Sequence, residues 1–121
     1  MTVIWISRCL GVVRVAVGMT ALVRPDRIVA GVGGPALVAA DQRALARMFG
    51  IRDVALGALA LSSQHAVRRA GLGLGVVADA GDAAALTIDR DERREAAGGT
   101  VAFAVASAVA GTVAIVAERR R

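Results

Sequence analysis

Five charged residues lie towards the middle of otherwise apolar stretches of the sequence and could do chemistry there. They are Arg14, Arg52, Asp53, Asp79 and Asp82. Asp79 and Asp82 are three residues apart, so on a helix their carboxylates share one face. Such a pair could share a proton or bind a divalent cation. Two carboxylates are too few for a metal site, and their segment holds no His or Cys. We therefore expect no metal ion and no other cofactor.

The remaining reactive residues form no recognisable catalytic set. His65, the single histidine, lies near Ser62 and Ser63 in a polar stretch that we expect to be a turn. No third residue completes a nucleophile–base system there. The run GLGLG at 71–75 lacks the preceding strand and the following Lys-Ser/Thr of a phosphate-binding loop. We predict no catalytic residue, and an enzyme that uses the paired carboxylates is the third of three hypotheses.

Four apolar segments must position the five charges. Hydrophobic residues make up 56% of the chain and the mean hydropathy is +0.61, whereas soluble domains are roughly 45–50% apolar. The segments cover about residues 2–23, 44–61, 70–88 and 98–117. Each has the length of roughly 17–25 residues that spans a bilayer as a helix. We predict an all-α fold, a single integral membrane domain over residues 1–121. It forms an up-down bundle of four transmembrane helices with short loops.

The connections between these segments fit the same division. Residues 24–43 contain both prolines, and Pro25 suits the first turn of a short helix. A Gly-Gly-Pro run at 33–35 then breaks that helix, so we expect one interfacial segment after the first span. Residues 62–69 and 89–97 are polar and are expected to be turns.

The net charge of the chain and the sequence of its N-terminus indicate which partners it binds and where in the cell it is located. The formal net charge is +5, but the arginines form no long stripe and no aromatic platform lies among them, so we expect no nucleic-acid partner. The N-terminus lacks the basic region of a signal peptide. Basic residues that are all Arg, with abundant Ala, Val and Gly, suggest a bacterial source. We expect a multi-pass protein of the cytoplasmic (inner) membrane, whose partners are the lipid bilayer and a second copy or another membrane protein. Arginines in the loops are nearly balanced between the two sides, so cytoplasmic termini are only the working expectation.

Small residues recur at spacings of four and three along each apolar segment. In bilayers such stripes let helix backbones approach closely. The glycines expected to pack helices together are Gly11, Gly18, Gly50, Gly57, Gly71, Gly75 and Gly111. The central charges lie in or beside these same stripes, which places them at helix contacts.

Pairing between helices would compensate these charges. A central Asp or Arg costs about 2.5–3.5 kcal/mol on insertion scales, so the third segment with two Asp residues should insert only with partners. Arg14 and Asp53 lie near the middle of their segments and should pair across the first hairpin. Arg52 lies about 100° around its helix from Asp53, so it should face Asp79 or Asp82.

Two further hypotheses concern what this charge network does. Buried ion pairs can set helix register and choice of partner without chemistry, which predicts a structural or accessory membrane subunit. Intramembrane acids can also line a path for protons or ions, which predicts a small transporter-like protein. A soluble helical domain is the alternative to both.

The run FGIRDVALG at 49–57, followed by ADAGDAA at 78–84, resembles a family of small bacterial four-span membrane proteins of unknown function. The resemblance covers most of the chain and rests on a Gly-x-Arg-Asp element in the second span and an Asp-containing third span. It implies an integral membrane protein and supplies no activity. The positions that it singles out are Gly50, Arg52, Asp53, Asp79 and Asp82.

Overall fold

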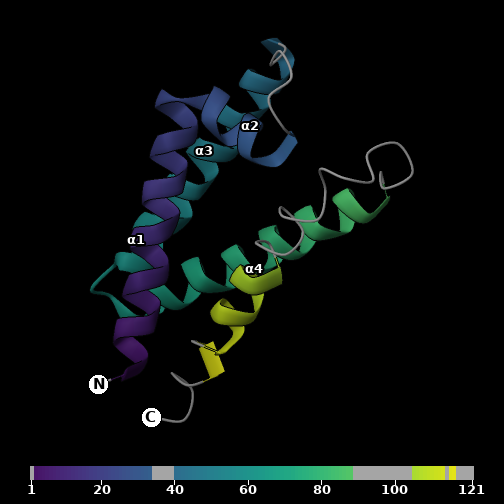
Figure 1. Cartoon of the computed structure of the whole chain (residues 1–121). Coiled ribbons are helices and arrows are strands. Elements are labelled where there is room, and N and C mark those ends of the chain that lie inside the picture. Colours follow the sequence, from purple (N-terminus) through teal and green to yellow (C-terminus); the bar gives the residue numbers. More distant parts are fainter. Residues whose placement is uncertain (1, 34–39, 89–104, 114, 117–121) are drawn as a thin grey trace.

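The described part of the chain is built of helices. A computed structural model describes residues 2–33, 40–88, 105–113 and 115–116, and no strand occurs among them. The elements are α1 (Thr2–Val23), α2 (Pro25–Gly33), α3 (Ala40–Leu61) and α4 (His65–Ile88) (Figure 1). A further helical stretch at 105–113 and 115–116 is here called the C-terminal segment. The all-α prediction is confirmed for these residues.

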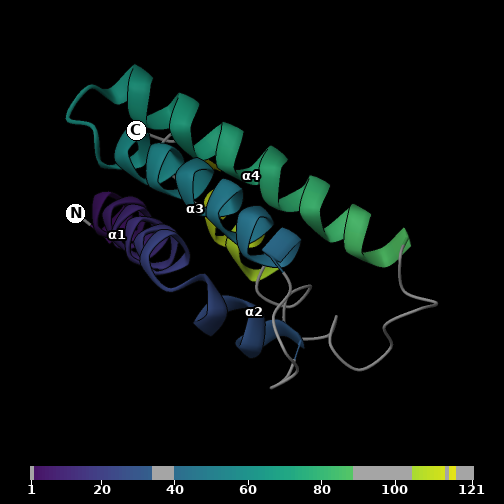
Figure 2. The same cartoon turned by 90° about the horizontal axis from the view of Figure 1, so that it is seen from above.

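The helix α3 lies at the centre of the arrangement. Seen from above, it runs between α1 and α4 (Figure 2). The helix α4 starts next to the end of α3 and runs obliquely away from α1 (Figure 1). Three helices can therefore bring side chains together at the middle of α3, which is where Arg52 and Asp53 are located.

Two helices begin earlier than their apolar segments. The helix α3 starts at Ala40, where the carboxylate of Asp41 suits the positive end of a helix dipole and accepts a hydrogen bond from the Gln42 amide at 2.9 Å. The helix α4 starts at His65, so the turn is only Ser62–Gln64. There the Gln64 amide donates to Ser62 Oγ at 3.2 Å. Polar residues of a first helical turn resemble a loop in the sequence, which is why the sequence predicted a longer turn.

The short helix α2 follows α1 after one residue. Arg24 N–H donates to the Thr20 carbonyl at 2.7 Å and so closes the last turn of α1. Pro25 then occupies the first turn of α2, where its missing N–H costs nothing. The helix ends at Gly33, and the rest of the expected Gly-Gly-Pro break lies outside the described residues.

The buried positions include charged residues, and many large apolar side chains are exposed. The buried apolar residues are mostly small, and buried polar residues include Arg14, Arg68 and Asp79. Many large apolar side chains are exposed: Met48 is 67% exposed and Val77 is 69% exposed. In a water-soluble domain large apolar residues are the ones most often buried and charged residues almost never are.

Only one of the described helices passes a simple test for a membrane span. The stretch Trp5–Val23 of α1 is long and apolar enough to cross a bilayer. Charges lower the hydropathy of α3 and α4, and most of the expected fourth span at 98–117 lies outside the described residues.

Candidate functional site: a charge network between glycine contacts

The helices α1 and α3 touch through their backbones at two glycine pairs. A Cβ atom on Gly18 would lie 2.6 Å from the carbonyl oxygen of Gly50, and one on Gly50 would lie 2.7 Å from that of Gly18. A Cβ on Gly57 would lie 2.8 Å from the carbonyl oxygen of Gly11. Gly11 near the start of α1 faces Gly57 near the end of α3, and Gly18 faces the earlier Gly50, so α1 and α3 are antiparallel. Neither pair leaves room for a side chain.

The other glycines expected to pack helices also lie at contacts. A Cβ on Gly71 would be 2.5 Å from Leu59 Cβ of α3, and one on Gly111 would be 2.7 Å from Val76 Cγ2 of α4. By contrast, Gly73 and Gly81, which the stripes did not include, have no atom within 4 Å of such a Cβ. The spacing of the glycines therefore separates contact positions from open ones on α4.

Arg14 lies between the two glycine pairs of α1 and joins three helices. Its Nη1 donates to Asp53 Oδ1 of α3 at 3.1 Å. Its Nη2 donates to the carboxylate of Asp79 and, at 3.4 Å, to the carbonyl oxygen of Gly75, both on α4. A Cβ on Gly75 would lie 3.2 Å from this Nη2. Because glycine has no side chain, there is room for the guanidinium at this position. The Arg14 side chain is only 8% exposed.

Arg52 forms the second half of the network. Its Nη1 and Nη2 donate to Asp82 Oδ1 at 2.9 Å and Oδ2 at 2.7 Å, a two-pronged pair with good geometry. Its Nη2 also lies 3.4 Å from Asp53 Oδ1. The guanidinium carbon stands 4.9 Å from the centre of the Phe49 ring, a cation–π distance. This half is more open, because Arg52 is 30% and Asp82 28% exposed.

The five residues form one continuous chain of contacts. In order they are Asp79, Arg14, Asp53, Arg52 and Asp82. Three carboxylates face two guanidinium groups, so the network has a formal charge of −1 when every group is ionised. Every carboxylate has at least one guanidinium partner, and Asp53 has two.

The structure brings the five charged residues together, and one of their ion pairs differs from the predicted pairing. Arg14 lies beside Asp53 as the hairpin pairing predicted, and Arg52 faces Asp82 of its two candidate partners. The contact of Arg14 with Asp79 was not predicted. The oblique path of α4 brings Asp79 to α1, and residue spacing within a helix carries no information on crossing angles between helices.

One buried arginine was missed. Arg68 was assigned to a polar turn, yet it is only 8% exposed and its Nη1 donates to the carbonyl oxygen of Ser62 at 3.2 Å. The signal for its burial is the apolar segment that begins two residues later, because a helix that starts a few residues before that segment includes Arg68 in its first turn.

The network can hold and orient charge, and it lacks the parts of a metal centre. Within the residues that the structure describes, no three or more His, Cys, Asp or Glu side chains gather as a possible metal site. The carboxylates are instead engaged by guanidinium groups. These ion pairs join α1, α3 and α4 in an all-helical protein.

Comparison with known proteins adds a family. The chain belongs to the family described as Domain of unknown function (DUF4267), whose model matches residues 11–114. That range contains all five network residues and all seven packing glycines. No curated protein and no solved structure matches the chain. The family description supplies no activity, in agreement with the expectation of an uncharacterised family.

Proposed function

We propose that this chain is an integral membrane protein of four helical spans. The observation that supports the membrane setting is that many large apolar side chains are exposed while Arg14, Arg68 and Asp79 are buried. A lipid surround favours exposed apolar side chains, and it favours small residues at helix contacts. A core helix of a soluble protein is mostly buried, whereas only 28% of the stretch Trp5–Val23 is buried.

The charges of α3 and α4 are compatible with this setting because they are paired. A central charge opposes insertion by about 2.5–3.5 kcal/mol. Arg14 of α1 compensates Asp53 and Asp79, and Arg52 compensates Asp82. We infer that α1 enters the bilayer on its own hydropathy and that α3 and α4 depend on it. This dependence also argues against α1 being a removable signal sequence.

The proposed role is that of a structural or accessory subunit of a bacterial inner membrane. Its partner would be a second copy or another membrane protein. The observation that carries this role is the closed network, since every carboxylate in it is already held by a guanidinium group within the chain. Buried ion pairs of this kind serve best to fix register and partner choice.

The single cysteine tests the membrane setting. Cys9 is exposed on the surface of the protein and lies within the proposed span of α1. We expect a water-soluble maleimide to label Cys9 at least about tenfold more slowly in membranes than in denaturant, because lipid excludes the reagent. A Cys9→Ala/Ser63→Cys variant is the control, since Ser63 lies in the exposed turn and should be labelled rapidly in both. Equal rapid labelling of Cys9, with release of the protein by alkaline carbonate, would refute the membrane setting.

A second candidate function is the handling of protons or cations. Two observations favour it: the network has one carboxylate more than it has guanidinium groups, and its end around Asp82 is the more exposed one. An excess carboxylate can bind a proton or a cation that crosses the bilayer.

Reconstitution into proteoliposomes separates the two functions. If transport is the role, we expect an ion-dependent flux that Asp82→Asn abolishes while the protein still folds, because the Arg52–Asp53 contact remains. Arg47→Gln is the control, since Arg47 is exposed and outside the network. A wild-type protein without flux under any proton or cation gradient supports the structural role.

A further inference from the structure

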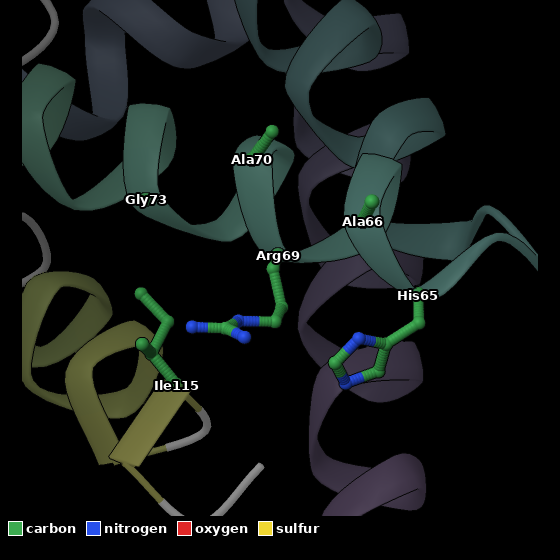
Figure 3. A pocket seen from close by; sticks show the side chains of 6 residues that line it. All are labelled: His65, Ala66, Arg69, Ala70, Gly73 and Ile115. Atoms are coloured by element: carbon green, nitrogen blue, oxygen red, sulfur yellow. The ribbon is translucent and has the colours of Figure 1, made fainter. Parts of the chain in front are cut away.

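A depression of about 500 Å³ lies between the beginning of α4 and the C-terminal segment. It is distinct from the charge network and is lined by His65, Ala66, Arg69, Ala70, Gly73 and Ile115. Figure 3 shows the guanidinium of Arg69 pointing towards Ile115, with the His65 ring on the other side of the Arg69 side chain. Five of the six lining residues thus lie on one face of the first three turns of α4.

The charged residues of this depression that the structure describes are basic. Within the described part of its lining there are a histidine and an arginine and no acidic residue. No carboxylate of the described residues pairs with Arg69, although the other partly buried arginines of α3 and α1 have acidic partners. A half-buried guanidinium at the edge of a hollow suits a phosphate group, which it can bind through two parallel hydrogen bonds.

The depression changes from basic to apolar along α4. His65, Arg69 and Gly73 follow one another at four-residue steps, each about 6 Å along the helix axis. His65 is at the helix end, next to the turn, and Gly73 lies deeper in the proposed span. A Cβ on Gly73 would meet no atom within 4 Å, so the depression is open at Gly73, where a ligand has room.

We propose that this depression binds an anionic phospholipid. The phosphate lies on Arg69 beside His65, and an acyl chain follows the open surface over Gly73. Basic pockets between helices near a membrane surface recognise anionic headgroups in this way. A free phosphate would use the basic end and leave the apolar floor empty. The inference rests on the proposed membrane setting and gives that protein a specific lipid partner.

Titration of the purified protein in a neutral detergent tests this inference. The probes are phosphatidylglycerol, phosphatidylcholine and inorganic phosphate, and the measurements are the thermal midpoint and the bound lipid seen by native mass spectrometry. Phosphatidylglycerol is expected to raise the midpoint and to bind in a one-to-one complex. Arg69→Gln should weaken this binding about tenfold or more, since it removes a charge-assisted contact. Gly73→Leu should weaken it as well by filling the apolar floor.

Matched variants make each result decisive. Arg47→Gln removes an exposed arginine outside the depression, and Gly81→Leu adds the same side chain at the other open glycine of α4; both should bind lipid as the wild type does. Equal losses in Arg69→Gln and Arg47→Gln, or equal binding of phosphatidylcholine, would overturn the lipid site. Full competition by inorganic phosphate would replace it by an anion site. A protein that resists carbonate extraction but binds no phosphatidylglycerol refutes the lipid site and leaves the membrane proposal standing.

Discussion

Arg14→Gln is expected to destabilise the protein by about 3–5 kcal/mol, the range for removing one partner of a buried ion pair. Arg14 holds both Asp53 and Asp79, and these side chains are 14% and 7% exposed. The glutamine would leave Asp79 without its cation in a buried position. The free energy of unfolding, measured in mild detergent with increasing denaturing detergent, gives the size of the loss. Arg47→Gln, at an exposed position, should change it by less than about 0.5 kcal/mol.

A second substitution distinguishes charge compensation from lost packing. In Arg14→Gln/Asp79→Asn the unpaired carboxylate is gone, while Asp53 keeps its contact with Arg52 at 3.4 Å. At least about 2 kcal/mol of the loss should return, because truncation of one partner mostly measures the charge left behind. If the double variant is no more stable than Arg14→Gln, the side chain acts through its packing and the network is not an electrostatic lock.

The same geometry explains why a simple charge exchange would mislead. Exchanging Arg14 and Asp53 preserves their own pair but places a carboxylate beside Asp79. It also sets the new arginine on α3 next to Arg52, which contacts Asp53 in the native chain. Each exchanged side chain would then be repelled by a neighbour of the same charge. A loss of stability in the exchanged protein would therefore not show whether Arg14 and Asp53 form a pair.

The sequence predicted the faces of the helices better than their arrangement. Spacings of four and three along one helix depend only on helix geometry, and they located Gly11, Gly18, Gly50 and Gly57 on the faces where α1 and α3 meet. The pairing of Arg14 with Asp53 followed from equal depth in two antiparallel segments. These features are local, or need only a hairpin.

Features that depend on a third helix could not be predicted in the same way. The contact of Asp79 with Arg14 requires the oblique path of α4 (Figure 1), and crossing angles follow from how side-chain ridges of both helices fit together. The depression beside Arg69 needs the C-terminal segment as its second wall. The sequence pattern of α4 and that of the C-terminal segment do not indicate which helix each of them packs against.

The glycine pairs and the ion pairs depend on one another. Arg14 reaches Asp53 only because Gly11 and Gly18 on either side of it bring the backbones of α1 and α3 into contact. A side chain at either glycine pushes the helices apart and lengthens the ion pair between them. A steric change at Gly18 should therefore also cost electrostatic energy, and that coupling sets the size of the second large effect.

Gly18→Ala is expected to cost about 3 kcal/mol, at the upper end for overpacking. The new Cβ would lie 2.6 Å from the Gly50 carbonyl oxygen and 2.8 Å from the Val54 amide nitrogen, and backbone atoms cannot turn aside as a side chain can. Gly81→Ala is the matched control: no atom lies within 4 Å, so it should gain about 0.5–1 kcal/mol from helix propensity. Unfolding in detergent measures both. Because Gly18 and Gly50 share one contact, Gly18→Ala/Gly50→Ala should cost less than the sum of the single variants. Strict additivity, or equal effects at Gly18 and Gly81, would mean that α1 and α3 do not meet through these glycines.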